Sequence, residues 1–291
     1  MPILIDFSGT VHAAVHVDVQ TNKSTTKEFL RHIILNQIRA IRKRFHEAYG
    51  EAVICMDSKT GYWRRDVFPY YKAKRKEARE ASNIDWGEVF GYVNEISQEI
   101  KENLPYKCIQ VNKAEADDII GTLAIKQPWG AETDLFGDTQ AESCLIVSND
   151  HDFKQLHRIN NVTQYFPFSG RTEKVAQPDL YLVEHILKGD TGDGIPNVRS
   201  PEDIFMSKGI RQKPVSTKYI KEFLSSGTVP EEDKARYEEN KQLIDLRLTP
   251  EAIQEHIIEA YKANPQGSRF KLFSYLAKSN CQALLSSIED F

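Results

Sequence analysis

The stretch of sequence that decides the fold is Cys144-Leu145-Ile146-Val147-Ser148-Asn149-Asp150-His151-Asp152, in which two aspartates closely follow a short apolar run. Two earlier runs have the same arrangement, because residues 2–5 lead into Asp6 and residues 52–56 lead into Asp57. Residues 108–111 form a fourth run. Apolar runs of this length, bounded by polar residues, are typical of buried parallel strands. We therefore predict a parallel sheet with acidic residues at the ends of its strands.

Apolar residues at helical spacing separate the predicted strands, over residues 29–45, 89–100 and 119–124. This alternation predicts an α/β fold, with a mainly parallel central sheet flanked by helices. After about Leu187 the strand-like runs largely stop, and helical stretches follow at residues 219–224, 232–246, 250–261 and 271–285. We predict an α/β domain at residues 1–187 and a smaller C-terminal helical domain at residues 188–291.

The composition indicates an ordinary globular protein, with 40% hydrophobic and 27% charged residues. No apolar stretch approaches the roughly 20 residues that cross a bilayer, and the first residues lack the pattern of a signal peptide. The four cysteines lie far apart, as expected for reduced thiols. We therefore expect a cytoplasmic protein without a membrane partner.

The net charge of −4 hides a strong segregation of charge along the chain. Residues 59–80 contain eight basic and three acidic side chains, and residues 207–221 contain five basic and no acidic ones. Much of the negative charge lies in the acidic motifs. Two basic surfaces around an acidic pocket suit a bound polyanion such as nucleic acid.

The acidic residues at the strand ends are expected to gather, because the carboxyl ends of parallel strands share one edge of a sheet. A fourth motif, Glu115-Ala116-Asp117-Asp118, opens a predicted helix, and a fifth, Gly189-Asp190-Thr191-Gly192-Asp193-Gly194, lies at the junction with the helical part. Neighbouring carboxylates repel one another unless cations neutralise them. Mg²⁺ prefers oxygen ligands, whereas the lack of His or Cys at ligand spacing disfavours zinc. Two such ions about 4 Å apart can promote phosphodiester hydrolysis.

Each acidic motif alone has an ordinary explanation as a turn, a helix cap or a loop, but their joint placement favours catalysis. Two other functions fit part of the pattern. Asp150-His151-Asp152 after a strand resembles a phosphatase that forms an aspartyl-phosphate, although Asp6, Asp57 and Glu115 would then be unexplained. A non-catalytic nucleic-acid-binding protein of the same fold would gain nothing from so much negative charge near phosphates.

The chain resembles the 5′-nuclease (flap endonuclease) superfamily over nearly its whole length. The matching segments are residues 4–8, 57–66, 70–72, 115–118, 148–153, 187–190, 236–240 and 287–291. The resemblance implies a PIN-like 5′-nuclease fold and a 5′-to-3′ exonuclease and flap endonuclease that acts on duplex DNA and on RNA–DNA hybrid, with ribonuclease H activity. It also implies two bound Mg²⁺ ions, for which Mn²⁺ can substitute.

The resemblance further implies roles for individual residues. The inner set of expected metal ligands is Asp6, Asp57, Glu115, Asp117 and Asp150. The outer set is Asp152, Asp190 and Asp193, and Asp118 is one additional candidate. Those expected to act in catalysis are Lys72, Arg75, Asp117 and Asp150. Those expected to contact nucleic acid from a basic helical gateway at about residues 59–80 are Trp63, Arg64, Arg65, Tyr70, Tyr71, Lys72, Lys74 and Arg75. Apart from the resemblance, the basic stretch in the C-terminal domain is expected to contact duplex phosphates through Lys208, Arg211, Lys213, Lys218 and Lys221.

One departure from the superfamily pattern follows Asp193. Residues 194–198 keep the pattern, but the repeated glycines of a hairpin that grips duplex DNA and holds a monovalent cation are missing. The resemblance also implies a role in removing lagging-strand RNA primers during phage DNA replication in an infected bacterial cell. The expected partners of a monomer are branched DNA and hybrid with 5′ ends, together with the phage single-strand DNA-binding protein.

Overall fold

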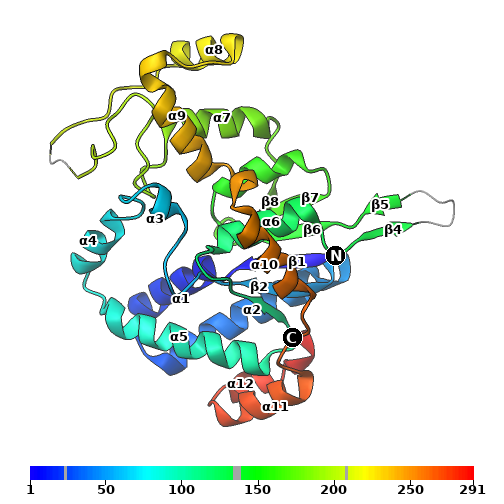
Figure 1. Cartoon of the computed structure of the whole chain (residues 1–291). Coiled ribbons are helices and arrows are strands. Elements are labelled where there is room, and N and C mark those ends of the chain that lie inside the picture. Colours follow the sequence, from blue (N-terminus) through cyan, green and yellow to red (C-terminus); the bar gives the residue numbers. More distant parts are fainter. Residues whose placement is uncertain (23–24, 134–138, 207–208) are drawn as a thin grey trace.

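A six-stranded sheet forms the centre of the computed structural model, which describes residues 1–22, 25–133, 139–206 and 209–291 (Figure 1). The strand order is β3-β2-β1-β6-β7-β8. The bounds are β1 Pro2–Asp6, β2 Glu51–Cys55, β3 Lys107–Ile109, β6 Cys144–Val147, β7 Val162–Phe166 and β8 Arg171–Glu173. Neighbouring strands of this sheet are parallel except for β7 and β8. β4 (Ala131–Thr133) and β5 (Thr139–Ala141) form a separate antiparallel pair that extends from the body of the molecule.

The four apolar runs form β1, β2, β3 and β6, which confirms the prediction of a mainly parallel sheet. β1 and β6 are buried along their whole length, because each lies inside the sheet and helices pack on both of its faces. The apolar pattern did not reveal β7, because Gln164 interrupts it. That glutamine is fully buried, and its amide donates hydrogen bonds to the carbonyls of Ser148 (3.0 Å) and Asp150 (2.7 Å). It therefore supports the loop that carries the acidic residues after β6.

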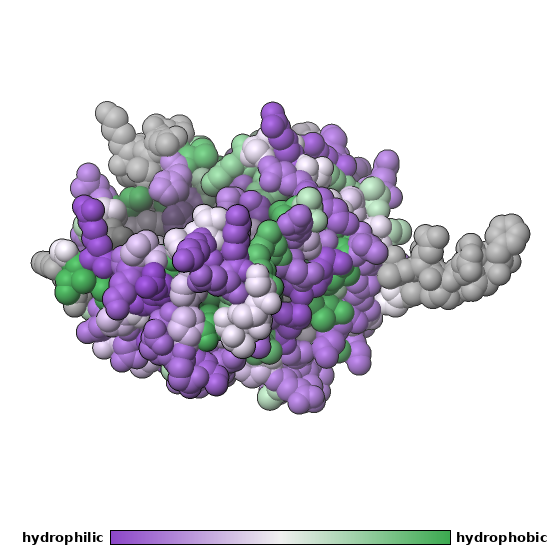
Figure 2. All heavy atoms as spheres, turned by 90° about the horizontal axis from the view of Figure 1, so that it is seen from above, coloured by the Kyte–Doolittle hydropathy of each residue, from purple (hydrophilic) through white to green (hydrophobic). Residues whose placement is uncertain are grey.

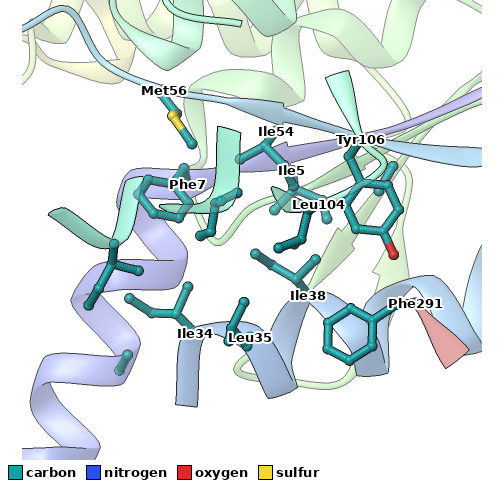
Figure 3. Close-up of a cluster of buried hydrophobic side chains, with 14 of the residues drawn as sticks. Ile5, Phe7, Ile34, Leu35, Ile38, Ile54, Met56, Leu104, Tyr106 and Phe291 are labelled. Carbon is teal, nitrogen blue, oxygen red and sulfur yellow. The ribbon is translucent and has the colours of Figure 1, made fainter. Parts of the chain in front are cut away.

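Helices cover both faces of the sheet. One face packs against α1 (Phe7–Asn22), α2 (Lys27–Tyr49), α5 (Trp86–Asn103), α11 (Arg269–Lys278) and α12 (Gln282–Leu285). Figure 3 shows this core, in which Ile5 and Ile54 of the sheet lie near Ile38 of α2 and Phe291. The other face packs against α6 (Ala116–Lys126), α10 (Glu251–Lys262) and the short 3₁₀ helix η1 (Asp152–Arg158). The α/β fold predicted from the sequence is confirmed.

Local signals explain where the long helices begin. The side chain of Thr26 caps α2 by accepting a hydrogen bond from the backbone of Phe29, and Asp85 caps α5 in the same way through Glu88. α1 follows β1 without a loop, so Asp6 lies at the junction of a strand and a helix. This junction places the Asp6 carboxylate at the edge of the sheet.

Another group of helices lies beside the carboxyl ends of the strands. It comprises α3 (Arg64–Val67), α4 (Lys74–Glu80), α7 (Pro178–Lys188), α8 (Thr217–Ser226) and α9 (Glu231–Ile244). Phe68 and Tyr71, next to α3, pack with apolar residues of α7 and α9. The basic gateway expected at about residues 59–80 therefore contains two short helices, α3 and α4.

The C-terminal helices contact the sheet as well as one another. α9 packs against α7, whereas α10 and α11 belong to the two cores that flank the sheet. Two short 3₁₀ helices, η2 (Leu246–Leu248) and η3 (Ile288–Asp290), complete this part of the chain. The division at residue 187 stays a prediction.

The surface is mostly polar. Figure 2 shows one face, on which hydrophilic side chains predominate and apolar ones form separate patches. Among the helices of the described residues, none has the length and apolar character needed to span a bilayer.

Candidate active site at the carboxyl ends of the strands

Three strands deliver carboxylates to one edge of the sheet. Asp6 is the last residue of β1, Asp57 follows β2, and Asp150 follows β6. Asp6 accepts hydrogen bonds from the Gly9 backbone (3.0 Å) and the Ser148 hydroxyl (2.7 Å). These three strands are adjacent and parallel, so the carboxylates meet as predicted from the sequence.

Asp57 is held by groups from two other segments. It accepts hydrogen bonds from the Ser8 hydroxyl (2.8 Å) and from the backbone of Ala116 (2.7 Å), the first residue of α6. Gly9 permits the same close packing around Asp6, because a Cβ atom at Gly9 would lie 2.8 Å from an Asp6 carboxylate oxygen. The positions of both carboxylates are thus fixed by the start of α1.

Asp118 has a structural environment that differs from the metal role suggested by the resemblance. Its carboxylate is fully buried and accepts hydrogen bonds from Trp63 Nε1 (3.1 Å), the Thr249 hydroxyl (3.0 Å) and the backbone of Glu115 (2.9 Å). It also pairs with the buried Arg64 guanidinium at 2.9 Å. Glu115 and Asp118 form a capping box at the start of α6. With its oxygens already occupied, Asp118 is better explained as part of the scaffold.

Glu115 lies between the scaffold and the open edge of the site. One of its oxygens accepts hydrogen bonds from Arg64 (3.0 Å) and the Tyr71 hydroxyl (2.9 Å), and the other contacts the Lys72 ammonium. The Tyr71 hydroxyl is also 2.8 Å from Asp193. Since a phenol has one proton, Tyr71 can donate to only one of these two carboxylates at a time. It therefore links the inner and outer acidic sets.

Two cations of the gateway point at the acidic cluster. Lys72 has φ of 57°, an uncommon backbone conformation for a residue other than glycine, and its Nζ lies 3.5 Å from Asp193. Arg75 contacts the other Asp193 oxygen at 2.5 Å. Burial lowers the pKa of Lys72, but the charges of Asp193 and Glu115 outweigh this effect and raise it, so the ammonium stays charged. Both cations lie where an anionic substrate would meet the carboxylates.

The outer set is formed by Asp152, Asp190 and their surroundings. Asp190 accepts hydrogen bonds from the backbones of Gly192 (2.7 Å) and Asp193 (3.1 Å). Gly189 has φ of 66°, and a Cβ atom there would lie 2.4 Å from the Ile195 carbonyl, so the turn before Asp190 requires glycine. A cavity of about 420 Å³ opens beside this turn, and its lining includes Asp150, Asp152, His185 and Asp190.

His185 was not identified from the sequence. It lies on α7, with Nδ1 3.6 Å from Asp152 and Nε2 3.4 Å from Asp190. One ligand atom from each of these three residues lies within 4.8 Å of the other two. No regular ligand spacing marks His185 in the sequence, because it meets Asp152 through the packing of α7 on η1. Its position five residues before Asp190, on the polar side of α7, was the available signal.

The electrostatics of the cluster favour bound cations. Burial raises the pKa of Asp6 to about 6, and the charges of Asp57 and Asp150 add to the rise. Burial and the Asp150 charge raise the pKa of Asp152 to about 7 and also raise that of Asp117. The ionised forms are thus disfavoured in the protein alone. Carboxylate oxygens are hard ligands, and here the neighbouring side chains do not fully compensate their negative charge, so the cluster suits divalent cations such as Mg²⁺.

Three of the expected nucleic-acid contacts need correction. Trp63, Arg64 and Tyr71 are buried, with 5%, 3% and 2% of their surfaces exposed, so they cannot stack on bases or meet phosphates directly. Their polar atoms bind Asp118, Glu115 and Asp193 instead. Sequence alone did not distinguish these residues from exposed ones, because the aromatic and basic residues alternate within the segment.

The remaining expected contacts are more accessible. Arg65, Lys74 and Arg75 are exposed, whereas Tyr70 and Lys72 are partly buried. In the C-terminal part Arg211, Lys213, Lys218 and Lys221 are exposed, and Lys208 lies outside the described residues.

A row of rings near α4 was also missed. His12 and His16 of α1 lie 5.1 Å apart between ring centroids, His12 lies 5.7 Å from Trp86 of α5, and Trp86 lies 5.7 Å from Phe90. Arg79 of α4 covers Phe90 at 5.4 Å. These rings come from two helices, so their alignment depends on the fold.

Comparisons with known proteins identify the family of this chain. The family described as "5'-3' exonuclease, N-terminal resolvase-like domain" matches residues 2–182, and "T4 RNase H, C terminal" matches residues 176–291. The Ribonuclease H of Enterobacteria phage T4 is 31% identical over 299 residues, which cover 99% of this chain and 95% of that protein. A 5'-3' exonuclease of Buchnera aphidicola is 29% identical over 57% of this chain and 54% of its own length.

Solved structures share the fold. A flap endonuclease of bacteriophage T5, in complex with DNA and metal ions, has a TM-score of 0.58 at 14% identity and covers 96% of this chain and 99% of that one. A T5 5'-exonuclease with bound zinc has a TM-score of 0.56 at 15% identity, with 96% and 98% coverage. Family membership decides against the phosphatase and the binding-only alternatives. The chain belongs to the 5′-3′ exonuclease family, and it is a 5′ nuclease related to phage ribonuclease H and to flap endonucleases.

Proposed function

We propose that this nuclease hydrolyses phosphodiesters at 5′ ends with two Mg²⁺ ions, which Mn²⁺ can replace. The inner cation is assigned to Asp6, Asp57, Glu115, Asp117 and Asp150, and the outer one to Asp152, Asp190 and Asp193. The observation that carries the proposal is the gathering of these carboxylates at one sheet edge, where burial and mutual repulsion raise the pKa of Asp6 and Asp152. Metal ions bound to the T5 relatives support the assignment. Asp118 is left out, because its hydrogen bonds belong to the scaffold.

The bound ions would activate a water molecule and stabilise the leaving oxygen. The protein contributes position and charge. Lys72 and Arg75 would contact the scissile phosphate, because their cationic groups already lie beside Glu115 and Asp193. The buried Arg64 and Tyr71 would hold Glu115 in place from behind. Since the backbone of Lys72 is fixed by a hydrogen bond to the Asp193 carbonyl (2.7 Å), its ammonium is pre-positioned.

The single 5′ strand would approach over α4 and the row of rings formed by His12, His16, Trp86 and Phe90. Two observations support this path. Phe90 is 45% exposed and both histidines are exposed, whereas Trp63 and Tyr71 are buried. The basic residues of α4 adjoin the rings, and aromatic rings beside basic groups suit single-stranded nucleic acid.

Duplex DNA would contact the region of residues 188–291, which we propose as the DNA-binding part of the chain. Arg211, Lys213 and Lys218 are exposed basic residues that would meet phosphates without reading sequence. The T5 relative was solved in complex with DNA, which supports DNA as a ligand of this fold.

The biological substrate is proposed to be RNA–DNA hybrid and branched DNA with 5′ ends. The similarity to the Ribonuclease H of phage T4 over 99% of this chain supports a role in removing lagging-strand RNA primers in an infected bacterial cell. Action as a monomer and contact with the phage single-strand DNA-binding protein remain predictions.

Cleavage of a 5′-labelled flap, a nicked duplex and a primer hybrid in Mg²⁺, followed by product sizing, tests the proposal. Asp150→Asn is expected to abolish cleavage while flap binding persists, because Asp150 lies close to both acidic sets. Asp179→Asn is a matched control, since the Asp179 side chain is 76% exposed and forms a surface ion pair with Arg158. Near-normal cleavage by Asp150→Asn would contradict the two-metal assignment.

A further inference from the structure

The outer acidic set contains one nitrogen donor, and this donor has no role in the function proposed above. His185 projects from the last turns of α7 toward the carboxylates of Asp152 and Asp190. Its side chain is 14% exposed and lines the cavity of about 420 Å³ beside the turn at Gly189. An imidazole at this place adds a nitrogen ligand to a set of carboxylate oxygen ligands.

The distances agree with a shared cation. An octahedral ion with ligands at about 2.1 Å places those ligands about 3.0 Å apart at right angles and about 4.2 Å apart across the ion. The ligand atoms of Asp152, His185 and Asp190 all lie within 4.8 Å of one another. Displacements of the ligand atoms by a few tenths of an ångström therefore suffice to bring all three within coordination distance of one ion. The backbone turn at Gly189 need not move.

The hydrogen bonding of His185 points the same way. Nε2 is buried and has no hydrogen-bond partner within the described parts of the chain, because its 3.4 Å approach to Asp190 lacks hydrogen-bond geometry. Nδ1 lies 3.6 Å from Asp152, beyond hydrogen-bond distance. A buried polar atom without a partner costs free energy. A cation between His185 and the two carboxylates would satisfy all three groups together.

We propose that His185 supplies a nitrogen ligand to the outer cation and thereby shifts the metal preference of that subsite from Mg²⁺ toward Mn²⁺. This inference rests on the proposed two-metal function. Mg²⁺ favours oxygen ligands and retains several waters. Imidazole favours transition metals, whose affinity for nitrogen-containing sites exceeds that of Mg²⁺. The inner cation, which is surrounded by carboxylates, keeps its preference for Mg²⁺.

The alternative is that His185 only orients Asp152 and Asp190 by charge. In that case its ring would touch the carboxylates but not the ion, and its loss would weaken Mg²⁺ and Mn²⁺ binding equally. Direct coordination predicts unequal effects. It also predicts a magnetic interaction between the imidazole nitrogen and a bound Mn²⁺ ion.

Pulsed electron paramagnetic resonance of the full chain with one and two equivalents of Mn²⁺ tests the inference without any cleavage assay. We expect nitrogen modulation from a coordinated histidine, which changes to the ¹⁵N pattern when the protein is made with ¹⁵N-histidine. The labelled wild-type protein needs no mutation, so the result does not depend on whether a variant folds. Bound Mn²⁺ without the histidine signal would overturn the inference and leave the two-metal function intact. Failure to bind Mn²⁺ at all would overturn both.

Two variants complete the test. His185→Gln should remove the histidine signal and weaken Mn²⁺ binding, measured by calorimetry, about 10-fold more than Mg²⁺ binding. His151→Gln is the matched control, because His151 lies between Asp150 and Asp152 in the chain but packs its ring against Phe166, with the ring centroids 5.9 Å apart. It should keep the signal. Equal losses of Mn²⁺ and Mg²⁺ affinity in His185→Gln, or loss of the signal in His151→Gln, would refute coordination by His185.

Discussion

Replacement of Asp118 by asparagine tests whether this carboxylate stabilises the fold or binds a cation. Asp118 is fully buried, and its two oxygens accept hydrogen bonds from Trp63, Arg64, Thr249 and the backbone of Glu115. Asparagine keeps the size of the side chain but removes its charge. Its NH₂ group would also face hydrogen-bond donors that the Asp118 carboxylate now accepts from. Of the two acidic partners that Arg64 has within the described part of the chain, the guanidinium, which is 3% exposed, then retains Glu115 alone.

The expected loss of stability is about 3–5 kcal/mol, the usual cost of removing one partner from a buried ion pair. Urea denaturation measures it directly. With a denaturant slope of about 3 kcal/mol per M, the midpoint should fall by about 1–1.7 M. Asp66→Asn is the control, because Asp66 and its partner Lys113 are 62% and 54% exposed. That exposed pair should be worth less than about 1 kcal/mol.

A carboxylate that waits for a metal should behave in the opposite way. At pH 7 and without metal, ionised Asp6 costs about 3 kcal/mol, as judged from its pKa of about 6. Asp6→Asn should therefore leave the metal-free protein as stable as before or more stable, while weakening Mg²⁺ binding. Asp118→Asn should leave Mg²⁺ affinity within about threefold at temperatures where it is folded. A stability loss below 1 kcal/mol in Asp118→Asn, together with loss of Mg²⁺ binding, would refute this division of roles.

Three further outcomes are expected. In EDTA, the free energy of unfolding should fall as the pH rises from about 4 to 7. The reason is that Asp6 and Asp152 have pKa values of about 6 and 7 in the folded protein, whereas the unfolded chain releases the same protons near pH 4. Saturating Mg²⁺ should flatten this pH profile, and a flat profile in EDTA would contradict the repulsion between the carboxylates. Lys72→Ala should lower kcat by about 10²–10³ with a smaller effect on substrate binding, in single-turnover assays, whereas a pure loss of affinity would indicate an ordinary phosphate contact. Phe90→Ala should weaken binding of a flap substrate, but not of a nicked duplex, by at least about fivefold in anisotropy titrations. Phe273→Ala, which removes an aromatic side chain of α11 that is 56% exposed against 45% for Phe90, should change neither.

The strand-end carboxylates could be predicted from the sequence because both parts of the signal are local. An apolar run marks each parallel strand, and the acidic residue follows it directly, as with Ile5 and Asp6. Once the strands are parallel and adjacent, the side chains after them must share an edge. The chain therefore specifies this half of the site without long-range information.

The other half depends on contacts between distant segments. Trp63 and Tyr71 have the same local composition as exposed gateway residues, and contacts with distant segments bury them, among them the hydrogen bonds to Asp118 and Asp193 and the packing of Tyr71 on α7 and α9. Asp118 looks like its neighbour Asp117, but a helix turns them to different sides, so one meets Arg64 and the other meets the site. His185 depends on the packing of α7 beside η1. Such pairings carry no pattern within a short stretch of sequence.

The position of Phe291 has a consequence for how the protein is made. This residue is fully buried in the same core as Ile3 and Ile5 of the first strand, and Leu272 and Leu276 of α11 lie in that core too. Contacts that join the first and last parts of a chain form slowly, because a long loop must close first. On the ribosome, residues 1–150 emerge with their clustered carboxylates while part of the apolar layer beneath the sheet is still unmade. The apolar core on this face of the sheet is therefore complete only after α11 has been synthesised, so the strands that carry the carboxylates gain their full packing late.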